Sequence, residues 1–275
     1  MNAPDKLPLP DVQAQADIRN LGIDSVGVKG VRYPLTISSA ERDMPSIANL
    51  TMSVSLPSHV KGTHMSRFLE ILEAQTGALS QQGLMTMAHA MLDKLDASAG
   101  TIEMRFPYFV KKTAPVSGVS SLLDIDVTWR ASIDQDGRQT VSLQVLVPAT
   151  SLCPCSRDIS DYGAHNQRSN IRIEVILEEK MAIEELIAIA ENSASCEVYG
   201  LLKRADEKYV TERAYDNPKF VEDMVRDIAL ALNSHMSVGR YSIEVENFES
   251  IHNHSAFACI SGAGGPPAAI QVAVS

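Results

Sequence analysis

The sequence predicts an α+β fold in which two similar units, each made of antiparallel strands and helices, follow one another along the chain. Three observations support this fold class: segments that alternate apolar and polar residues, segments with the apolar period of a helix, and the return of both kinds of segment in the second half. Of the 275 residues, 45% are hydrophobic and 21% are charged, which suffices for one large core or two modest ones.

The first half places two helical segments between alternating ones. Residues 48–56 and 121–133 alternate apolar with polar side chains, as half-buried antiparallel strands do, and residues 141–147 repeat the pattern. Between the first two segments lie two helical patterns, Met65 to about Gln75 and Leu84 to Leu95. The expected order is therefore strand, two helices and further strands.

The second half follows a similar order. Residues 171–177 and 241–245 alternate, and Ile183 to Ala190 has a helical pattern. Two tandem units, residues 1–150 and residues 151–275, are the economical interpretation of this repetition. A single α+β domain with extended loops is the alternative.

Charge and hydropathy exclude several classes of function. The formal net charge of -10 disfavours a nucleic-acid surface, because neutralising phosphates needs a basic face. No apolar run is long enough to cross a membrane, and the opening residues lack the pattern of an export signal. We therefore expect a cytoplasmic protein that binds neither nucleic acid nor membrane, and a small anionic substrate remains compatible with the composition.

The segment SLCPCSRDISDYGAHNQRSN, residues 151–170, is the first candidate site. Thiolate and imidazole together suit zinc and related divalent ions, and Cys153 with His165 is the natural pair because the loop between them contains Gly163. Two cysteines separated by one residue point in opposite directions in an extended chain, so we expect Cys155 to be a neighbour and not a ligand. A buried, unreactive thiol pair and a redox switch are the alternatives.

A second polar segment, ENFESIHNHSAF, covers residues 246–257. It contains Glu249, His252 and His254 just beyond a predicted strand, and two histidines separated by one residue lie on the same side of an extended segment. Such histidines can bind a metal or transfer protons near neutral pH. Taken singly, each is more often an ordinary loop histidine.

A third segment, residues 203–223, combines carboxylates with the expected start of a helix. Asn217 as N-cap and Pro218 at the first helical position predict a helix that runs to about His235. Glu222 would lie in its first turn, where a carboxylate interacts favourably with the helix dipole without any ligand. Glu207, like most glutamates, could simply be solvated.

Basic residues close to these segments could hold a phosphate group. For each of them, exposure to solvent is the more usual role. The candidates are Arg168, Lys203 and Arg204.

Four segments together resemble GTP cyclohydrolase of type IB, the folate-pathway enzyme that converts GTP to dihydroneopterin triphosphate and formate. They are SLCPCSRDISDYGAHNQRS, KRADEKYVTE, AYDNPKFVED and ESIHNHSAFA. The opening DVQAQADIRNLGIDSVGVKGVRYPL is also similar to the start of that family, so the resemblance runs through almost the whole chain. One small departure is Arg157, where lysine is commoner.

The resemblance implies a tunnelling fold. In that fold each chain carries two tandem tunnelling-fold units, which are antiparallel sheets with helices layered on one face. It also implies a homotetramer built around a barrel-like tunnel, with active sites at the subunit interfaces.

The resemblance further implies one divalent metal ion per site, Zn²⁺, Mn²⁺ or Fe²⁺, bound by Cys153, His165 and Glu207. Cys153 would also be catalytic. His252 and His254 would act as general acid and base, with Glu249 orienting one of them or contacting the metal site.

GTP is the substrate that the resemblance implies. Glu222 would anchor guanine, because a carboxylate can accept hydrogen bonds from N1–H and the 2-amino group in parallel. The cations expected to hold the triphosphate are Arg168, Lys203, Arg204, Lys111 and Lys112.

Two alternatives stand beside this interpretation. One is another tunnelling-fold enzyme that acts on a pterin or deazapurine, with Cys153 as a covalent nucleophile. The other is a metal-stabilised assembly module in which Cys153, His165 and Glu207 close a structural site.

Overall fold

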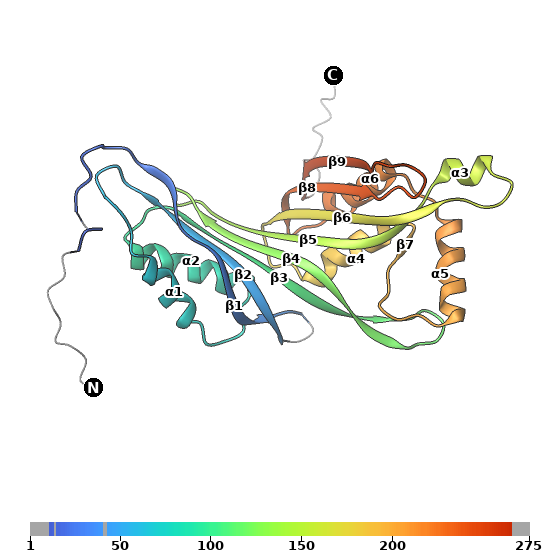
Figure 1. The fold of residues 1–275 in the computed structure, drawn as a ribbon, viewed down its shortest axis with the longest axis horizontal. Coiled ribbons are helices and arrows are strands. Elements are labelled where there is room, and N and C mark those ends of the chain that lie inside the picture. Colours follow the sequence, from blue (N-terminus) through green and yellow to red (C-terminus); the bar gives the residue numbers. More distant parts are fainter. Residues whose placement is uncertain (1–10, 14, 41–42, 266–275) are drawn as a thin grey trace, which may run out of the picture.

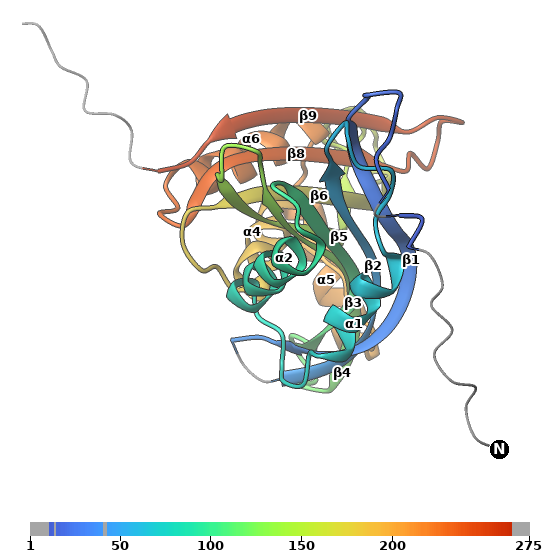
Figure 2. The ribbon, with the colours of Figure 1, turned by 90° about the vertical axis from the view of Figure 1, so that its left-hand side faces the viewer.

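The computed structural model describes residues 11–13, 15–40 and 43–265, and these form one nine-stranded antiparallel sheet with helices packed on one face (Figure 1). Along the main path of the sheet the order is β1-β2-β3-β4-β5-β6-β8-β9, and β7 pairs with the end of β5. The sheet curves around the helices, as Figure 2 shows. The predicted α+β class with helices on one face is confirmed.

The order strand, strand, helix, helix, strand, strand occurs twice among the described elements. The first set is β1 (Ile23–Ser38), β2 (Asp43–Leu56), α1 (Met65–Glu73), α2 (Gln81–Leu95), β3 (Gly100–Thr113) and β4 (Ser120–Ile133). The second is β5 (Gln139–Leu152), β6 (Asn166–Leu177), α4 (Ile183–Ser193), α6 (Val221–Asn233), β8 (Val238–Asn247) and β9 (Ala256–Ala263). Three short or polar elements are added to the second set, namely α3 (Pro154–Ile159), β7 (Cys196–Glu197) and α5 (Arg204–Asp216).

The sheet continues without a break across the predicted unit boundary. Residues 150 and 151 both lie inside β5, which pairs with β4 on one side and with β6 on the other. One hydrophobic cluster also contains core residues from both halves. The division into residues 1–150 and 151–275 therefore stays a prediction. The repeated order of elements starts again at β5, which begins at Gln139.

Alternation along the strands produces the core. In β4 the side chains of Ile125, Val127, Trp129 and Ala131 are buried, and the residues between them face away from the helices. The strands expected from alternation are all present, at residues 48–56, 121–133, 141–147, 171–177 and 241–245.

The helix expected to begin at Pro218 begins later, so this prediction is wrong. Its N-cap is Phe220, and Asn217 instead ends α5. Asn217 is held at the end of α5, where its side-chain Nδ2 donates to the carbonyls of Ala194 and Ser195, at 2.9 and 3.2 Å. The carboxylate of Asp223 accepts from the Phe220 N–H instead, at 3.0 Å.

No helix in the described part of the chain combines the length and the apolar character of a transmembrane span.

Candidate functional site

The hairpin between β5 and β6 brings the first two predicted metal ligands together. Its last regular pair is Leu152 with Asn166, and beyond it the Cys153 N–H donates to the His165 carbonyl at 3.1 Å. Cys153 is the N-cap of α3, and its Sγ accepts from the Ser156 N–H at 3.5 Å. The thiol and the imidazole therefore belong to neighbouring positions at the base of the loop.

Glu249 reaches the same place from the loop that follows β8. The side chains of His165 and Glu249 are only 14% and 13% exposed, and His165 Nδ1 lies 4.0 Å from Glu249 Oε2. Ser250 Oγ is 3.5 Å from the same nitrogen. Residues more than 80 positions apart in the chain are thus neighbours, because β6 pairs with β8.

His252 and His254 lie on the same loop between β8 and β9. Their rings stack, with centroids 5.2 Å apart and planes inclined by 18°, and both residues are exposed. His254 Nδ1 is also 3.3 Å from Asn253 Oδ1. These two imidazoles follow Glu249 closely in the sequence and lie open to an incoming molecule.

Glu207 is not grouped with Cys153 and His165. It lies exposed in the first turn of α5, and no cluster of three His, Cys, Asp or Glu side chains that could hold a metal occurs among the described residues. Cys153 and His165 offer sulfur and nitrogen, which fits a divalent ion of the zinc type, as two members of a set that needs a further donor.

The predicted substrate-binding residues are spread over several elements. Glu222 is exposed in the first turn of α6, as expected, and Arg168 on β6 lines a pocket. Lys203 and Arg204 are exposed at the start of α5.

Of the two lysines on β3, Lys111 is exposed, whereas Lys112 forms an ion pair with Glu191. Lys112 Nζ donates to both carboxylate oxygens of Glu191 at 2.7 Å, and both side chains are 14% exposed. Burial raises the pKa of Glu191, although the hydrogen bonds from Lys112 oppose this shift. Lys112 is therefore no longer a candidate for the triphosphate.

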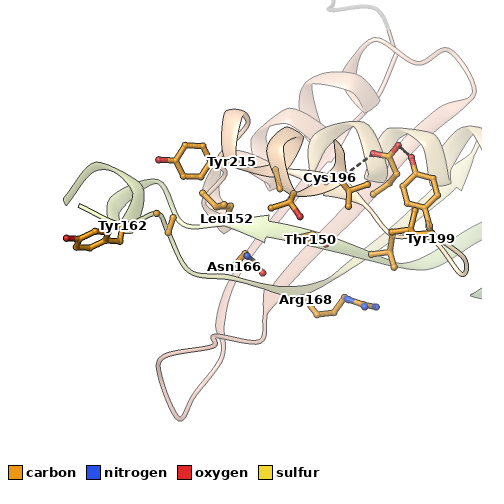
Figure 3. Close-up of a pocket in the computed structure, with 16 residues that line it drawn as sticks. Thr150, Leu152, Tyr162, Asn166, Arg168, Cys196, Tyr199 and Tyr215 are labelled. Carbon is orange, nitrogen blue, oxygen red and sulfur yellow. Dashed lines mark hydrogen bonds between the residues drawn. The ribbon is translucent and has the colours of Figure 1, made fainter. Parts of the chain in front are cut away.

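A pocket of about 500 Å³ lies beside the hairpin, between β5, β6, β7 and α5 (Figure 3). Tyr162 and Tyr215 lie at one end of it and Tyr199 at the other. Its volume is in the range of small-molecule sites in proteins. Thr150 and Arg168 contribute polar groups from the strands.

A carboxylate that the sequence analysis did not single out forms one wall of this pocket. Glu197 accepts from the Tyr199 hydroxyl at 2.5 Å and from the Arg213 guanidinium at 2.9 Å. Burial opposes ionisation of Glu197, but the bond from Tyr199 and the charge of Arg213 leave its pKa lowered. Burial and the hydrogen bond to Glu197 raise the pKa of Tyr199, so the phenol stays protonated and donates.

Comparison with known proteins places the chain among relatives of one kind. The family described as type I GTP cyclohydrolase folE2 matches residues 9–258. A GTP cyclohydrolase FolE2 1 from Dechloromonas aromatica is 60% identical over 265 residues, which cover 95% of this chain and 99% of that protein. A GTP cyclohydrolase FolE2 from a Janthinobacterium species is 57% identical over 252 residues, which cover 92% and 94%.

Solved structures support the fold independently of sequence. A hyper-thermostable uricase mutant superimposes with a TM-score of 0.52 at 9% sequence identity, covering 90% of this chain and 94% of that one. At that identity the likeness concerns the fold alone, which is the tunnelling fold expected from the resemblance. With a family match across residues 9–258 and relatives at 60% and 57% identity, this chain belongs to the type I GTP cyclohydrolase folE2 family.

Proposed function

We propose that the protein is a GTP cyclohydrolase that opens the imidazole ring of guanine in GTP, giving 7,8-dihydroneopterin triphosphate and formate, the first step of tetrahydrofolate biosynthesis. Family membership supports the reaction. One structural observation supports its location: Cys153 pairs with His165 at the base of the β5–β6 hairpin, and the β8–β9 loop brings Glu249 Oε2 to 4.0 Å from His165 Nδ1. An imidazole beside a carboxylate, at the loop that also carries a thiol, offers groups that can take part in hydrolysis.

In this proposal Cys153 and His165 hold a divalent ion, Zn²⁺, Mn²⁺ or Fe²⁺, together with Glu207. When bound, such an ion polarises water so that it can attack carbon at neutral pH. Because Glu207 is not grouped with the other two ligands in one chain, we propose that the site is completed between chains. A ligand set of one sulfur, one nitrogen and one oxygen is less selective for zinc than a site with two cysteines.

Hydrolysis of the imidazole ring moves protons at each step. Water adds at C8, the ring nitrogen takes up a proton as the ring opens, and a second hydrolysis releases formate. We propose that His252 and His254 donate and accept these protons, because both rings are exposed on the loop that carries Glu249. Glu249 orients one of these two histidines or contacts the metal site, since its carboxylate lies 4.0 Å from His165 Nδ1.

Binding of GTP needs one carboxylate and several cations. We propose Glu222 for guanine, since its exposed carboxylate at the start of α6 can accept two parallel hydrogen bonds from the base. Arg168, Lys203, Arg204 and Lys111 remain the candidates for the triphosphate.

We also propose that the protein assembles as a homotetramer with active sites at the subunit interfaces. In the described sheet, β1 and β9 are the two end strands, and each pairs on one side only. Such edges pair readily with other chains. Phe257 on β9 is 70% exposed, which suits a strand that another copy covers.

Replacement of Cys153 tests the location of the chemistry. Cys153→Ala should abolish formate release from GTP and lower the metal content, because the sulfur ligand is lost. Cys155→Ala, two residues away and exposed, is the matched control and should keep most activity. Full formate release by Cys153→Ala, measured on protein of wild-type oligomeric mass, would contradict the proposal.

Replacement of Glu222 tests the guanine anchor. Glu222→Ala should weaken GTP binding by about 1.5–3 kcal/mol, as expected for loss of hydrogen bonds to a charged group. Metal content should not change, because Glu222 is not a proposed ligand. Calorimetric titration with GTP measures the affinity, and an unchanged Kd would remove Glu222 from this role.

A further inference from the structure

A row of buried polar side chains lies beneath Cys153 and His165. Towards the middle of the sheet the inward-facing positions of β6 are apolar, with Ile171 and Ile173 both fully buried. Towards the hairpin they become polar at Ser169 and Gln167, which are 0% and 7% exposed, and Ser151 opposite Gln167 on β5 is 0% exposed. Burying such groups is unfavourable unless they are hydrogen-bonded, so their arrangement calls for a reason.

In the structure the Gln167 amide lies with its nitrogen towards Ser151 and its oxygen towards His165. Its Nε2 donates to Ser151 Oγ at 2.7 Å, and its Oε1 lies 3.0 Å from Nδ1 of His165. An amide oxygen can only accept a hydrogen bond. With the amide in this orientation, His165 Nδ1 is the nitrogen that carries the hydrogen in this contact, and in the neutral ring the lone pair lies on Nε2.

The surroundings of the His165 ring agree with this tautomer. Gln167, Ser250 and Glu249 all approach Nδ1, at 3.0, 3.5 and 4.0 Å. Within the described part of the chain, Nε2 has no hydrogen-bond partner. The only nitrogen of this imidazole that is free to bind a metal is thus the one that Gln167 leaves unprotonated.

We propose that Gln167, oriented by Ser151, is a positioning residue that holds His165 in the Nδ1–H tautomer and presents Nε2 as the metal donor. The inference rests on the metal site of the proposed function. Outer groups that bind the second ring nitrogen fix the orientation of a ligating histidine and raise its affinity for metal. Here a neutral amide takes the place that a carboxylate or backbone carbonyl usually occupies.

The tautomer can be measured directly in metal-free wild-type protein. Imidazole ¹⁵N chemical shifts, with the His165 signals identified by their absence in His165→Asn, should show a protonated Nδ1 and an unprotonated Nε2 in the neutral ring. A protonated Nε2 would overturn the proposal. This measurement needs no variant of Gln167, so it decides the question even if such a variant fails to fold.

Variants then test the effect on metal binding. Gln167→Leu should lower Zn²⁺ affinity by about 10- to 100-fold, as measured by competition with a chelator. Gln167→Glu keeps an acceptor for Nδ1–H and should stay within a few-fold of wild type. Gln144→Leu, a half-buried glutamine on β5 outside the site, is the control for the substitution itself and should not change the affinity. Wild-type Zn²⁺ affinity in folded Gln167→Leu would refute the positioning role.

The readouts separate this inference from the proposed function. Suppose that wild-type protein releases no formate, but its His165 is protonated at Nδ1 and it binds Zn²⁺ more tightly than Gln167→Leu does. The proposed reaction would then be wrong, and the role of Gln167 would stand. Normal formate release with no effect of Gln167→Leu on Zn²⁺ affinity would remove the role of Gln167 alone.

Discussion

At the scale of single residues, burial separates the four cysteines into different chemical classes. Cys153 is half-buried, Cys155 and Cys259 are exposed, and Cys196 is buried. Burial, followed by the charge of the neighbouring Glu197, raises the pKa of Cys196 to about 11. A thiol reacts as thiolate, so burial and charge both protect Cys196 from modification.

We predict that Cys196 is the slowest cysteine to be alkylated. At pH 8 a pKa of about 11 leaves roughly one thiol in a thousand ionised, and the side chain is also sheltered. Timed labelling of native protein with iodoacetamide, followed by peptide mass spectrometry, should show Cys155 modified long before Cys196. Equal rates for the two would show that the β7 region opens readily or that Cys196 is not desolvated.

At the scale of elements, a single carboxylate joins the β3–β4 turn to α5. Asp206, fully buried, accepts from the backbone N–H groups of Val116 and Ser117 at 2.8 Å, and from the Ser117 hydroxyl at 2.6 Å. It also accepts from the Lys203 N–H at 2.8 Å and so caps the helix. Burial favours the neutral form, but these four hydrogen bonds outweigh it and lower the pKa of Asp206.

We predict that Asp206→Asn lowers the thermal unfolding midpoint at neutral pH, because the amide cannot accept all four bonds. A lowered pKa means that the contribution of Asp206 is present above the ordinary pKa of aspartate, about 3.9, and is lost as the pH falls below it. The difference in midpoint between wild type and variant should therefore be constant above about pH 5 and shrink towards pH 3.

Asp216→Asn is the matched control for this prediction. Asp216 is the last residue of the same helix and is exposed, so its replacement should change the midpoint little at any pH. A difference for Asp206→Asn that stays constant down to pH 3 would contradict the role of the ionised carboxylate. Glu207, the proposed metal ligand, follows Asp206 in α5. The hydrogen bonds of Asp206 therefore also fix the position of Glu207.

At the scale of the whole molecule, one buried glutamine joins the first set of elements to the second. Gln81 begins α2, and its Nε2 donates to the Met181 carbonyl at 2.7 Å, while its Oε1 accepts from the Met181 N–H at 3.4 Å. Met181 lies just before α4, so these two hydrogen bonds connect α2 to the start of α4. The two residues that they join are 100 positions apart in the chain. Both backbone groups of Met181 depend on this side chain.

We predict that Gln81→Leu destabilises the protein by about 1–3 kcal/mol, since it leaves buried backbone groups without partners. Gln82→Leu, at the adjacent exposed position, should have a much smaller effect. The midpoint of urea unfolding compares the two variants at equal protein concentration. Similar midpoints for both would show that water or a shift of the chain satisfies Met181 instead.

Alternation and helical period predicted most of the elements, and the exceptions have physical causes. Helix α5 was missed because only Asp206 and Ala214 are buried along it, so it has no apolar stripe. Strands β1 and β9 lie at the ends of the sheet, where many side chains are exposed and alternation carries less information. Strand β3 does alternate, with Ile102 and Met104 buried, so its sequence carries the same signal as the strands that alternation predicts.

For the candidate site, the sequence indicated residue types but not all neighbours. The pairing of Cys153 with His165 was expected, because a short loop with a glycine joins them. The proximity of Glu249 could not be predicted, since it depends on β6 pairing with β8 across some 80 residues. The role of Gln167 is not predicted either, although the change from apolar to polar residues at Ser169 and Gln167, along one face of β6, is visible in the sequence.

The sequence by itself determined the class of fold, the family and the chemical character of the site, because periodicity, charge and short motifs are local properties of a chain. Only the tertiary structure decided that Glu249 lies beside His165, that Lys112 is paired with Glu191, and which nitrogen of His165 faces Gln167. These features depend on strand register and on the direction of hydrogen bonds between residues far apart in the chain. Neither is encoded in any single segment.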